Sequence, residues 1–113
     1  GLPKREFLHT SDFADACIKV MNISKKKYFD LTGNINQFIN IGYGKEISIK
    51  DLTKLICKIV KYSGKIEYDK NKPNGTFRKL IDSSKLKKIN WSPKILLEEG
   101  IKSIIKDNDN LLK

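Results

Sequence analysis

Apolar residues recur every three or four positions in several stretches of the chain, and this spacing is typical of amphipathic helices. The clearest helix is predicted to begin after Ser48, because Ser48 and Asp51 resemble a capping box, and to stop at Gly64. A last helix is predicted over 96–106, with two acidic residues favourably placed in its first turn. The apolar stripes of these two helices are formed by Ile49, Leu52, Leu55, Ile56, Ile59 and Val60 in the first, and by Leu97, Ile101, Ile104 and Ile105 in the last.

Two further helices are predicted from the same kind of spacing. The first begins at Thr10 or Ser11, either of which can cap it, and fades near Lys25. A short helix is predicted within 82–89, and the chain breaks it before Pro93 because the residue that precedes a proline avoids helical geometry. One face of the first helix is marked by Phe13, Cys17, Val20, Met21 and Ser24.

Short extended segments lie between the predicted helices. Residues 5–9 are consistent with a strand that leads into the first helix, and 38–42 with a strand that ends in a Gly-Tyr-Gly turn. Residues 65–68 alternate apolar and polar positions, which predicts a third strand. Residues 30–37 indicate an exposed loop, and the Pro, Asn and Gly within 72–76 indicate a turn. Strands therefore alternate with helices, and this order predicts an α/β fold without an internal repeat.

The composition is that of a soluble globular protein, and 113 residues are enough for one domain or part of one. The 39% of apolar residues exclude a disordered chain, and no apolar run approaches the roughly 18 residues that a membrane-spanning helix needs. The chain begins at Gly1 without a methionine or a signal peptide. We therefore expect it to be a piece of a longer polypeptide or a trimmed form of one.

Cys17 and Cys57 lie on apolar faces of predicted helices, where a free cysteine acts as a small hydrophobic residue. Their separation, with His9 as the single histidine of the sequence, offers neither the ligand spacing of a zinc site nor a disulfide framework. We therefore expect no metal site, and we expect the protein to reside in the reducing cytoplasm.

The net charge of +10 suggests nucleic-acid binding as one function class. The lysines, however, are spread along predicted helix faces, as at Lys54, Lys58 and Lys61, where solvated faces normally carry charge. Only 25–27 form a run of lysines, and no nucleic-acid motif accompanies it. We therefore expect no nucleic-acid partner and no membrane association, and a basic nucleic-acid-binding module stays an alternative.

Arg5 and Arg78 stand out because they are the two arginines of the sequence. The rest of its 23 lysines and arginines are lysines. A guanidinium group presents five donors in a plane and grips a carboxylate or a phosphate in a way that lysine cannot imitate. Both arginines are therefore candidates for binding an anion. The alternative is an ordinary surface arginine or an intramolecular salt bridge.

Four segments, in this order along the chain, resemble those of one enzyme family. They are Arg5-Glu6-Phe7-Leu8-His9 with Asp12 and Ala14-Asp15-Ala16, then Asn40-Ile41-Gly42-Tyr43-Gly44, then Lys72-Pro73-Asn74-Gly75-Thr76-Phe77-Arg78-Lys79-Leu80, and finally Ile89-Asn90-Trp91-Ser92-Pro93-Lys94-Ile95 with Leu97-Glu98-Glu99-Gly100. The chain resembles, over nearly its whole length, the C-terminal portion of the GDP-L-fucose synthases, which are extended short-chain dehydrogenase/reductases. The third segment is the most specific, because the first two occur across the extended family.

The resemblance implies an NADPH-dependent enzyme that epimerises GDP-4-keto-6-deoxymannose at C3 and C5 and then reduces it at C4. Residues 1–45 would form the tail of its Rossmann-type domain, and 46–113 the small C-terminal lobe that binds the GDP-sugar. The N-terminal domain that binds NADP and the family's catalytic residues would lie upstream. We therefore expect no catalytic role for His9 or Cys17, and no activity from the chain alone. The full-length protein is expected to be a homodimer.

The resemblance also implies four substrate-binding residues. Arg5 matches the arginine of the family's Arg-Glu-Phe-Leu-His motif, which contacts the substrate nucleotide. Arg78 and Lys79 match family cations and could place positive charge near the phosphates. For Lys79, an ordinary solvated lysine is the alternative. Asn74 stands where the family has an aspartate that contacts the substrate, and Phe77 stands where it has a proline. Because of Asn74, two alternatives stay open: a relative that acts on another GDP-4-keto-6-deoxy sugar, such as a heptose, and an inactive remnant.

Overall fold

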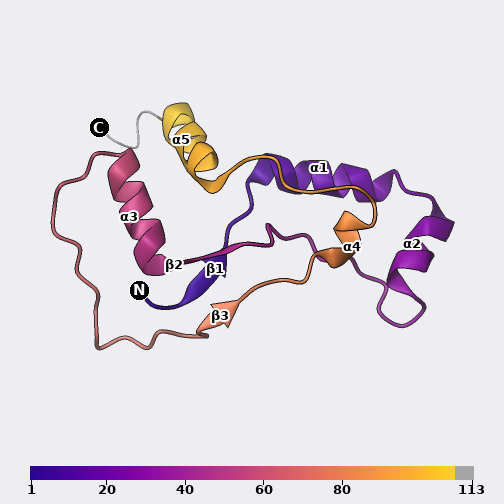
Figure 1. The fold of residues 1–113 in the computed structure, drawn as a ribbon, viewed down its shortest axis with the longest axis horizontal. Helices are drawn as coiled ribbons and strands as arrows, with labels where there is room; N and C mark the ends of the chain where they lie inside the picture. Colours follow the sequence, from indigo (N-terminus) through magenta and orange to yellow (C-terminus); the bar gives the residue numbers. More distant parts are fainter. Residues whose placement is uncertain (109–113) are drawn as a thin grey trace.

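The computed structural model describes residues 1–108, and Figure 1 shows how their elements are arranged. In chain order these elements are β1 (Lys4–Glu6), α1 (Thr10–Met21), α2 (Lys25–Thr32), β2 (Glu46–Ser48), α3 (Ile49–Ile59), β3 (Arg78–Lys79), α4 (Ser84–Lys87) and α5 (Leu97–Asp107). The sheet lies near the middle of the long axis. α3 and α5 lie toward one end, and α2 and α4 lie toward the other (Figure 1).

The sheet has the order β2-β1-β3, with β1 in the centre. β1 pairs with β2 in the antiparallel orientation and with β3 in the parallel orientation. A parallel pair needs a long connection, and here the chain passes through α1, α2, β2 and α3 before it returns as β3. This mixed sheet with its helices confirms the predicted α/β class.

The two most amphipathic helices form where their apolar spacing predicts them, although α3 ends at Ile59, before the predicted stop at Gly64. α3 begins after Ser48, whose hydroxyl oxygen accepts a hydrogen bond from the backbone N–H of Asp51 at 3.0 Å, as its predicted capping role requires. α5 covers Leu97–Asp107, within one residue of the predicted range at each end. At its start the Glu99 carboxylate accepts from the backbone N–H of Leu96 at 3.4 Å. Local capping chemistry therefore sets the start of both helices.

α1 and α4 are confirmed as helices but differ in detail from the prediction. α1 begins at Thr10, yet its cap is His9, whose Nδ1 accepts a hydrogen bond from the backbone N–H of Ser11 at 3.2 Å. α4 covers only Ser84–Lys87, inside the predicted range 82–89. The cap of α1 therefore comes from a side chain that helix statistics rank low for this position.

A helix forms at α2, where the sequence analysis predicts the end of a helix and the exposed loop 30–37. Ser24 caps it, because its hydroxyl oxygen accepts from the backbone N–H of Lys27 at 3.2 Å. Gly33 ends it with a φ of 70°, a conformation that glycine adopts without strain. The loop prediction is therefore wrong over its first residues, because a run of lysines conceals the apolar spacing of this helix.

The strands predicted at 38–42 and 65–68 do not form within the described part of the chain. A strand needs a partner ladder for its N–H and C=O groups, and nothing among residues 1–108 pairs with either segment. Ile39 and Ile41 instead pack their side chains against the core. The third strand of the sheet is β3, which follows the predicted turn within 72–76 rather than preceding it.

The hydrophobic core lies where α1 meets α4 and the segment after it. Its buried members are Ala16, Leu86, Ile89 and Trp91. The face of α1 marked by sequence spacing is only partly the buried one: Val20 packs against the core, whereas Phe13 is 51% exposed and Met21 is 82% exposed. The inward positions of α1 are Asp12, Ala16 and Val20, which also recur at helical spacing but begin with a carboxylate.

Two acidic residues of α1 fasten the segment that leads into α5. The Asp12 carboxylate, only 3% exposed, accepts hydrogen bonds from the backbone N–H groups of Lys94 at 3.1 Å and Ile95 at 2.9 Å. Asp15 accepts from the indole Nε1–H of Trp91 at 2.8 Å. A buried carboxylate is tolerated only when such donors replace its water, so Asp12 belongs on the inner face of the helix.

The molecule is extended for its length. It measures 54 × 33 × 18 Å and has a radius of gyration of 17.6 Å, whereas a compact domain of this length has about 13 Å. Its accessible surface of 8757 Å² exceeds by roughly 2,400 Å² the area expected for a compact monomer of this mass. Much apolar surface therefore stays uncovered, including Phe13, Met21, Ile35 and Phe38.

Candidate anion-binding site

Three of the four residues that the sequence predicts to bind substrate lie in the sheet, and two of them, Arg5 and Lys79, lie on the same face. Arg5 of β1 is in register with Lys79 of β3, and Lys4 is in register with Arg78. Side chains alternate between the two faces of a strand, and residues in register share a face. Arg5 and Lys79 therefore lie on one face of the sheet, and Lys4 and Arg78 lie on the other.

Acidic residues balance the face that carries Lys4 and Arg78. Glu46 of β2 accepts a hydrogen bond from Arg78 Nε at 2.6 Å, and its carboxylate lies 3.5 Å from Lys4 Nζ. The hydrogen bond and charge of Arg78, helped by Lys4, hold the pKa of the Glu46 carboxyl below its ordinary value. Glu6, in register with Glu46, adds a second carboxylate to this face. Two cations and two carboxylates therefore face each other here, and their charges cancel.

The opposite face has no such balance. The Arg5 guanidinium donates to the carbonyl oxygen of Lys4 at 2.6 Å, and neither Arg5 nor Lys79 forms an ion pair with any of residues 1–108. Ile47, the residue of β2 in register with Arg5, is apolar. Like charges directly opposite each other on paired strands disfavour the pairing. A bound anion would relieve this repulsion, which makes this face a candidate anion-binding site.

The other two predicted site residues are placed differently. Arg78 forms the intramolecular salt bridge that the sequence analysis gives as the alternative reading, although 61% of its side chain is exposed. Asn74 lies in the exposed segment between α3 and β3, beside Gly75, whose φ is 66°. The turn of this segment lies at residues 70–71, earlier than the predicted 72–76. No hydrogen bond within the described residues joins Asn74 to the sheet. The structure therefore brings Arg5 and Lys79 together and shows no such contact for Asn74.

Sequence reasoning missed the part that Glu6 plays beside this site. Its Oε2 accepts from the backbone N–H of Gly44 at 3.0 Å, and its Oε1 accepts from that of Ile81 at 2.6 Å. The only signal in the sequence was its place next to Arg5. A hydrogen bond to a backbone N–H far along the chain leaves no pattern that spacing or propensity could reveal.

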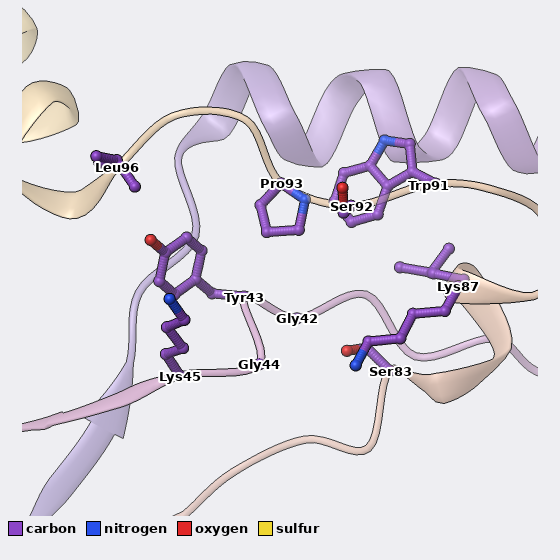
Figure 2. Close-up of a pocket in the computed structure, with 11 residues that line it drawn as sticks. Gly42, Tyr43, Gly44, Lys45, Ser83, Lys87, Trp91, Ser92, Pro93 and Leu96 are labelled. Carbon is purple, nitrogen blue, oxygen red and sulfur yellow. The ribbon is translucent and has the colours of Figure 1, made fainter.

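A cavity of about 300 Å³ lies next to the turn that Glu6 holds. Figure 2 shows Tyr43 within the Gly42–Gly44 turn, and Pro93 and Trp91 on a neighbouring segment of the chain. Both segments belong to motifs of the sequence, but their separation along the chain hides the fact that they face each other. The cavity walls combine aromatic rings with the side chains of Lys45 and Lys87.

The described residues hold no further group with obvious chemistry. Among residues 1–108 no three His, Cys, Asp or Glu side chains are close enough together to hold a metal ion. Cys17 and Cys57 are free and half-buried. His9 packs against Gly100, where an added Cβ would lie 2.9 Å from the imidazole Cδ2. None of the helices described here has the length and apolar character to cross a membrane.

No family model matches the chain. GDP-L-fucose synthase 1 of Arabidopsis thaliana is 43% identical over 101 residues, which are 89% of this chain and 28% of that relative. Among solved structures, a GDP-6-OMe-4-keto-L-xylo-heptose reductase from C. jejuni matches with a TM-score of 0.86 and 34% identity, over 96% of this chain and 32% of that chain. GDP-mannoheptose C4 reductase from Campylobacter jejuni, solved with NADP bound, matches with a TM-score of 0.79 and 36% identity. The match covers 94% of this chain and 32% of that chain.

These similarities extend over almost the whole described chain, whereas the chain spans less than a third of the length of each of these relatives. By sequence and by fold, the chain is therefore similar to part of the GDP-L-fucose synthases and of GDP-sugar reductases of the extended short-chain dehydrogenase/reductase type.

Proposed function

We propose that the chain is the C-terminal, substrate-binding portion of an NADPH-dependent GDP-sugar epimerase/reductase of the GDP-L-fucose synthase type. In this proposal Arg5 and Lys79 bind the diphosphate of the GDP-sugar. The observation that carries it is their register on one face of the sheet, without an acidic partner among residues 1–108. A guanidinium can donate two parallel hydrogen bonds to one phosphate, while the ammonium group of Lys79 adds a point charge beside it.

The contribution of this chain is to bind and orient the sugar nucleotide. The cofactor supplies the hydride when it is bound, and we propose that the part of the protein upstream of this chain holds it together with the catalytic residues. Solved neighbours with NADP support that cofactor choice. Arg5 and Lys79 would hold the diphosphate equally well before and during the reaction. Their substitution should therefore raise KM more than it lowers kcat.

The proposal divides the chain between two parts of the parent protein. Residues 1–45 would complete a Rossmann-type domain, and 46–113 would form the smaller lobe that binds the sugar nucleotide. The unpaired 38–42 segment supports this, because an added strand could supply the ladder it lacks. The uncovered side chains of Phe13 and Met21, together with the large accessible surface, support it as well. A cytoplasmic homodimer, as the family resemblance implies, is part of the same proposal.

The sugar is the less defined part of the substrate, and a GDP-heptose is the second candidate. Two observations favour it: the solved neighbours include GDP-heptose reductases, and Asn74 replaces the family's aspartate. An amide keeps an acceptor for a hydroxyl group but loses the charge. Comparing GDP-4-keto-6-deoxymannose with a GDP-4-keto-6-deoxyheptose as substrates would decide between the two.

Calorimetric titration of the purified protein with GDP tests the diphosphate site. We expect Arg5→Lys to weaken GDP binding about tenfold, because it loses one of two charged hydrogen bonds worth about 1.4 kcal/mol. Lys79→Ala should weaken binding by a similar factor. Lys54→Ala is the matched control, since it removes an exposed lysine from α3. Equal affinity of all four proteins for GDP would contradict the proposal. Tight binding to duplex DNA that falls steeply with salt would favour the nucleic-acid alternative.

A further inference from the structure

Glu6 connects three segments that are far apart in the sequence. It belongs to β1, directly after Arg5, and its two carboxylate oxygens accept from backbone N–H groups in two other segments. One is the N–H of Gly44, in the turn that lines the cavity of Figure 2. The other is the N–H of Ile81, two residues after Lys79. One side chain therefore fixes the turn and the end of β3 relative to the strand that carries Arg5.

The surroundings of Glu6 are shaped to keep its carboxylate in this place. Gly42 is buried, and a Cβ added to it would lie 2.9 Å from Oε2 and 3.2 Å from Oε1 of Glu6. Real Cβ atoms do not approach other atoms so closely, so a side chain at position 42 would displace the carboxylate. Gly42 therefore leaves the space that the carboxylate of Glu6 occupies, and its role is close approach rather than a special backbone conformation.

The negative charge of Glu6 lies one residue from Arg5, and it repels an anion bound there. In register with Glu6 lies Glu46, whose charge is offset by Arg78 and Lys4. Glu6 forms no ion pair with any described residue, and its charge is met by backbone donors instead. Besides accepting these two bonds, Glu6 contributes a negative charge one residue from Arg5, on the opposite face of the sheet.

We propose that Glu6 is a positioning residue for the anion-binding site, acting through the backbone of Gly44 and Ile81 to hold β3 and Lys79 against Arg5. This inference rests on the proposed function, in which Arg5 and Lys79 bind the GDP diphosphate. Without the bond to Ile81, β3 is held by its short pairing with β1, which consists of two registered pairs, and by the hydrogen bond from Arg78 to Glu46. Lys79 then no longer has a fixed distance from Arg5.

The substitution Glu6→Gln should raise the affinity for GDP if Glu6 acts only through its charge, and lower it if Glu6 acts by positioning. Removing a negative charge near an anion site strengthens anion binding if the charge acts only through space. If Glu6 acts by positioning, the amide group of the variant can accept only one of the two backbone bonds, and GDP binding weakens. We expect about tenfold weaker binding for Glu6→Gln, with a larger loss for Glu6→Ala.

The experiment measures GDP affinity by calorimetry, and backbone hydrogen–deuterium exchange of the 42–45 and 78–82 segments, for the purified protein and its variants. Glu46→Gln is the matched control, because it removes a carboxylate from the same face of the same sheet; its GDP affinity should stay the same or rise. Asp12→Asn controls for general destabilisation, because it loosens the α1 contact with Lys94 and Ile95. Its melting temperature should fall while its GDP affinity is retained.

The expected result is faster exchange in both segments and weaker GDP binding for Glu6→Gln alone among the three variants. Unchanged or tighter GDP binding by Glu6→Gln would overturn the positioning role while leaving the proposed function in place. Loss of affinity in Asp12→Asn equal to that in Glu6→Gln would also overturn it, because general loosening would then explain both. If the unmodified protein does not bind GDP, or Arg5→Lys binds it equally well, the proposed function fails, and the positioning role falls with it.

Discussion

The indole N–H of Trp91 donates to the carboxylate of Asp15 at 2.8 Å, although 76 positions separate the two residues in the sequence. This hydrogen bond, helped by the positive charges of Lys94 and Lys19, holds the pKa of the Asp15 carboxyl below its ordinary value. Trp91 is itself part of the buried core. The charge state of an exposed carboxylate is thereby coupled to the core between α1 and α4.

The first prediction concerns acid stability. Because the Asp15 pKa is lower in the folded state than in the unfolded state, the folded protein binds fewer protons, and Asp15 stabilises the fold at neutral pH. This contribution should disappear as the pH falls from about 4 through the lowered folded-state pKa. We expect Asp15→Asn to lower the melting temperature at pH 7 and to make it less sensitive to acid. Thermal unfolding followed by Trp91 fluorescence at pH 7 and pH 3 checks this, and an unchanged acid sensitivity in the variant would contradict it.

The second prediction concerns the buried carboxylate of Asp12. Asp12→Ala leaves two backbone N–H groups, those of Lys94 and Ile95, without an acceptor, and should cost about 2–4 kcal/mol of unfolding free energy. Asp12→Asn should cost less, because its amide oxygen can still accept. Urea denaturation measures both values. Asp30→Ala on the exposed side of α2 is the control and should change stability by less than about 0.5 kcal/mol. A cost for Asp12→Ala no larger than that of the control would show that the two bonds do not form in solution.

The third prediction is a double-mutant cycle between Gly42 and Glu6. Gly42→Ala should destabilise the protein, because the new methyl group displaces the Glu6 carboxylate from its two backbone donors. In a protein that already carries Glu6→Ala, the same substitution should cost almost nothing. We expect a coupling energy of about 1–2 kcal/mol between the two positions, measured by urea denaturation of the four proteins. Additive effects would mean that Gly42 is required for a reason other than the space that Glu6 needs.

The fourth prediction concerns the uncovered face of α1. Phe13 and Met21 contribute little to the core between α1 and α4, because 51% and 82% of their surfaces are exposed. Replacing both by serine should therefore leave unfolding free energy within about 1 kcal/mol of the unmodified value. If this face associates with other apolar surfaces, the same substitutions should reduce self-association, measured by light scattering across a range of concentrations. A large loss of stability would indicate that both side chains are buried in solution.

How far the sequence predicts this fold depends on whether the relevant contacts are local. α3 and α5 follow from their own apolar spacing and capping residues, and both form where expected. Ser24 is an equally local cap for α2, but three lysines directly after it obscured the helix. Apolar spacing does not show that Asp12 lies on the inner face of α1, because the two backbone donors that its carboxylate accepts from lie more than eighty positions away. No local pattern could have indicated those donors.

The same distinction between local and distant contacts applies to the candidate site. The rarity of arginine and the motif around Arg5 pointed to anion binding from the sequence alone. The sequence did not show that Lys79 shares a face with Arg5 while Arg78 faces Glu46, because adjacent residues of a strand point to opposite sides. Strand register decides which of two neighbouring cations can meet a ligand beside Arg5. That register is set by pairing between segments at opposite ends of the chain.

The parallel pairing of β1 with β3 has a kinetic consequence. The two strands meet only after the chain between residues 6 and 78 has closed a very large loop, and closing such a loop is entropically expensive before the contacts form. Contacts between residues so far apart in the sequence slow folding, and the pairing of β1 with β3 forms late. The helices can form early from local information, whereas the pair of cations exists only once the most distant contacts are made. A folding intermediate with all of its helices would therefore have no anion site, so that ligand binding reports on the completion of folding rather than on helix content.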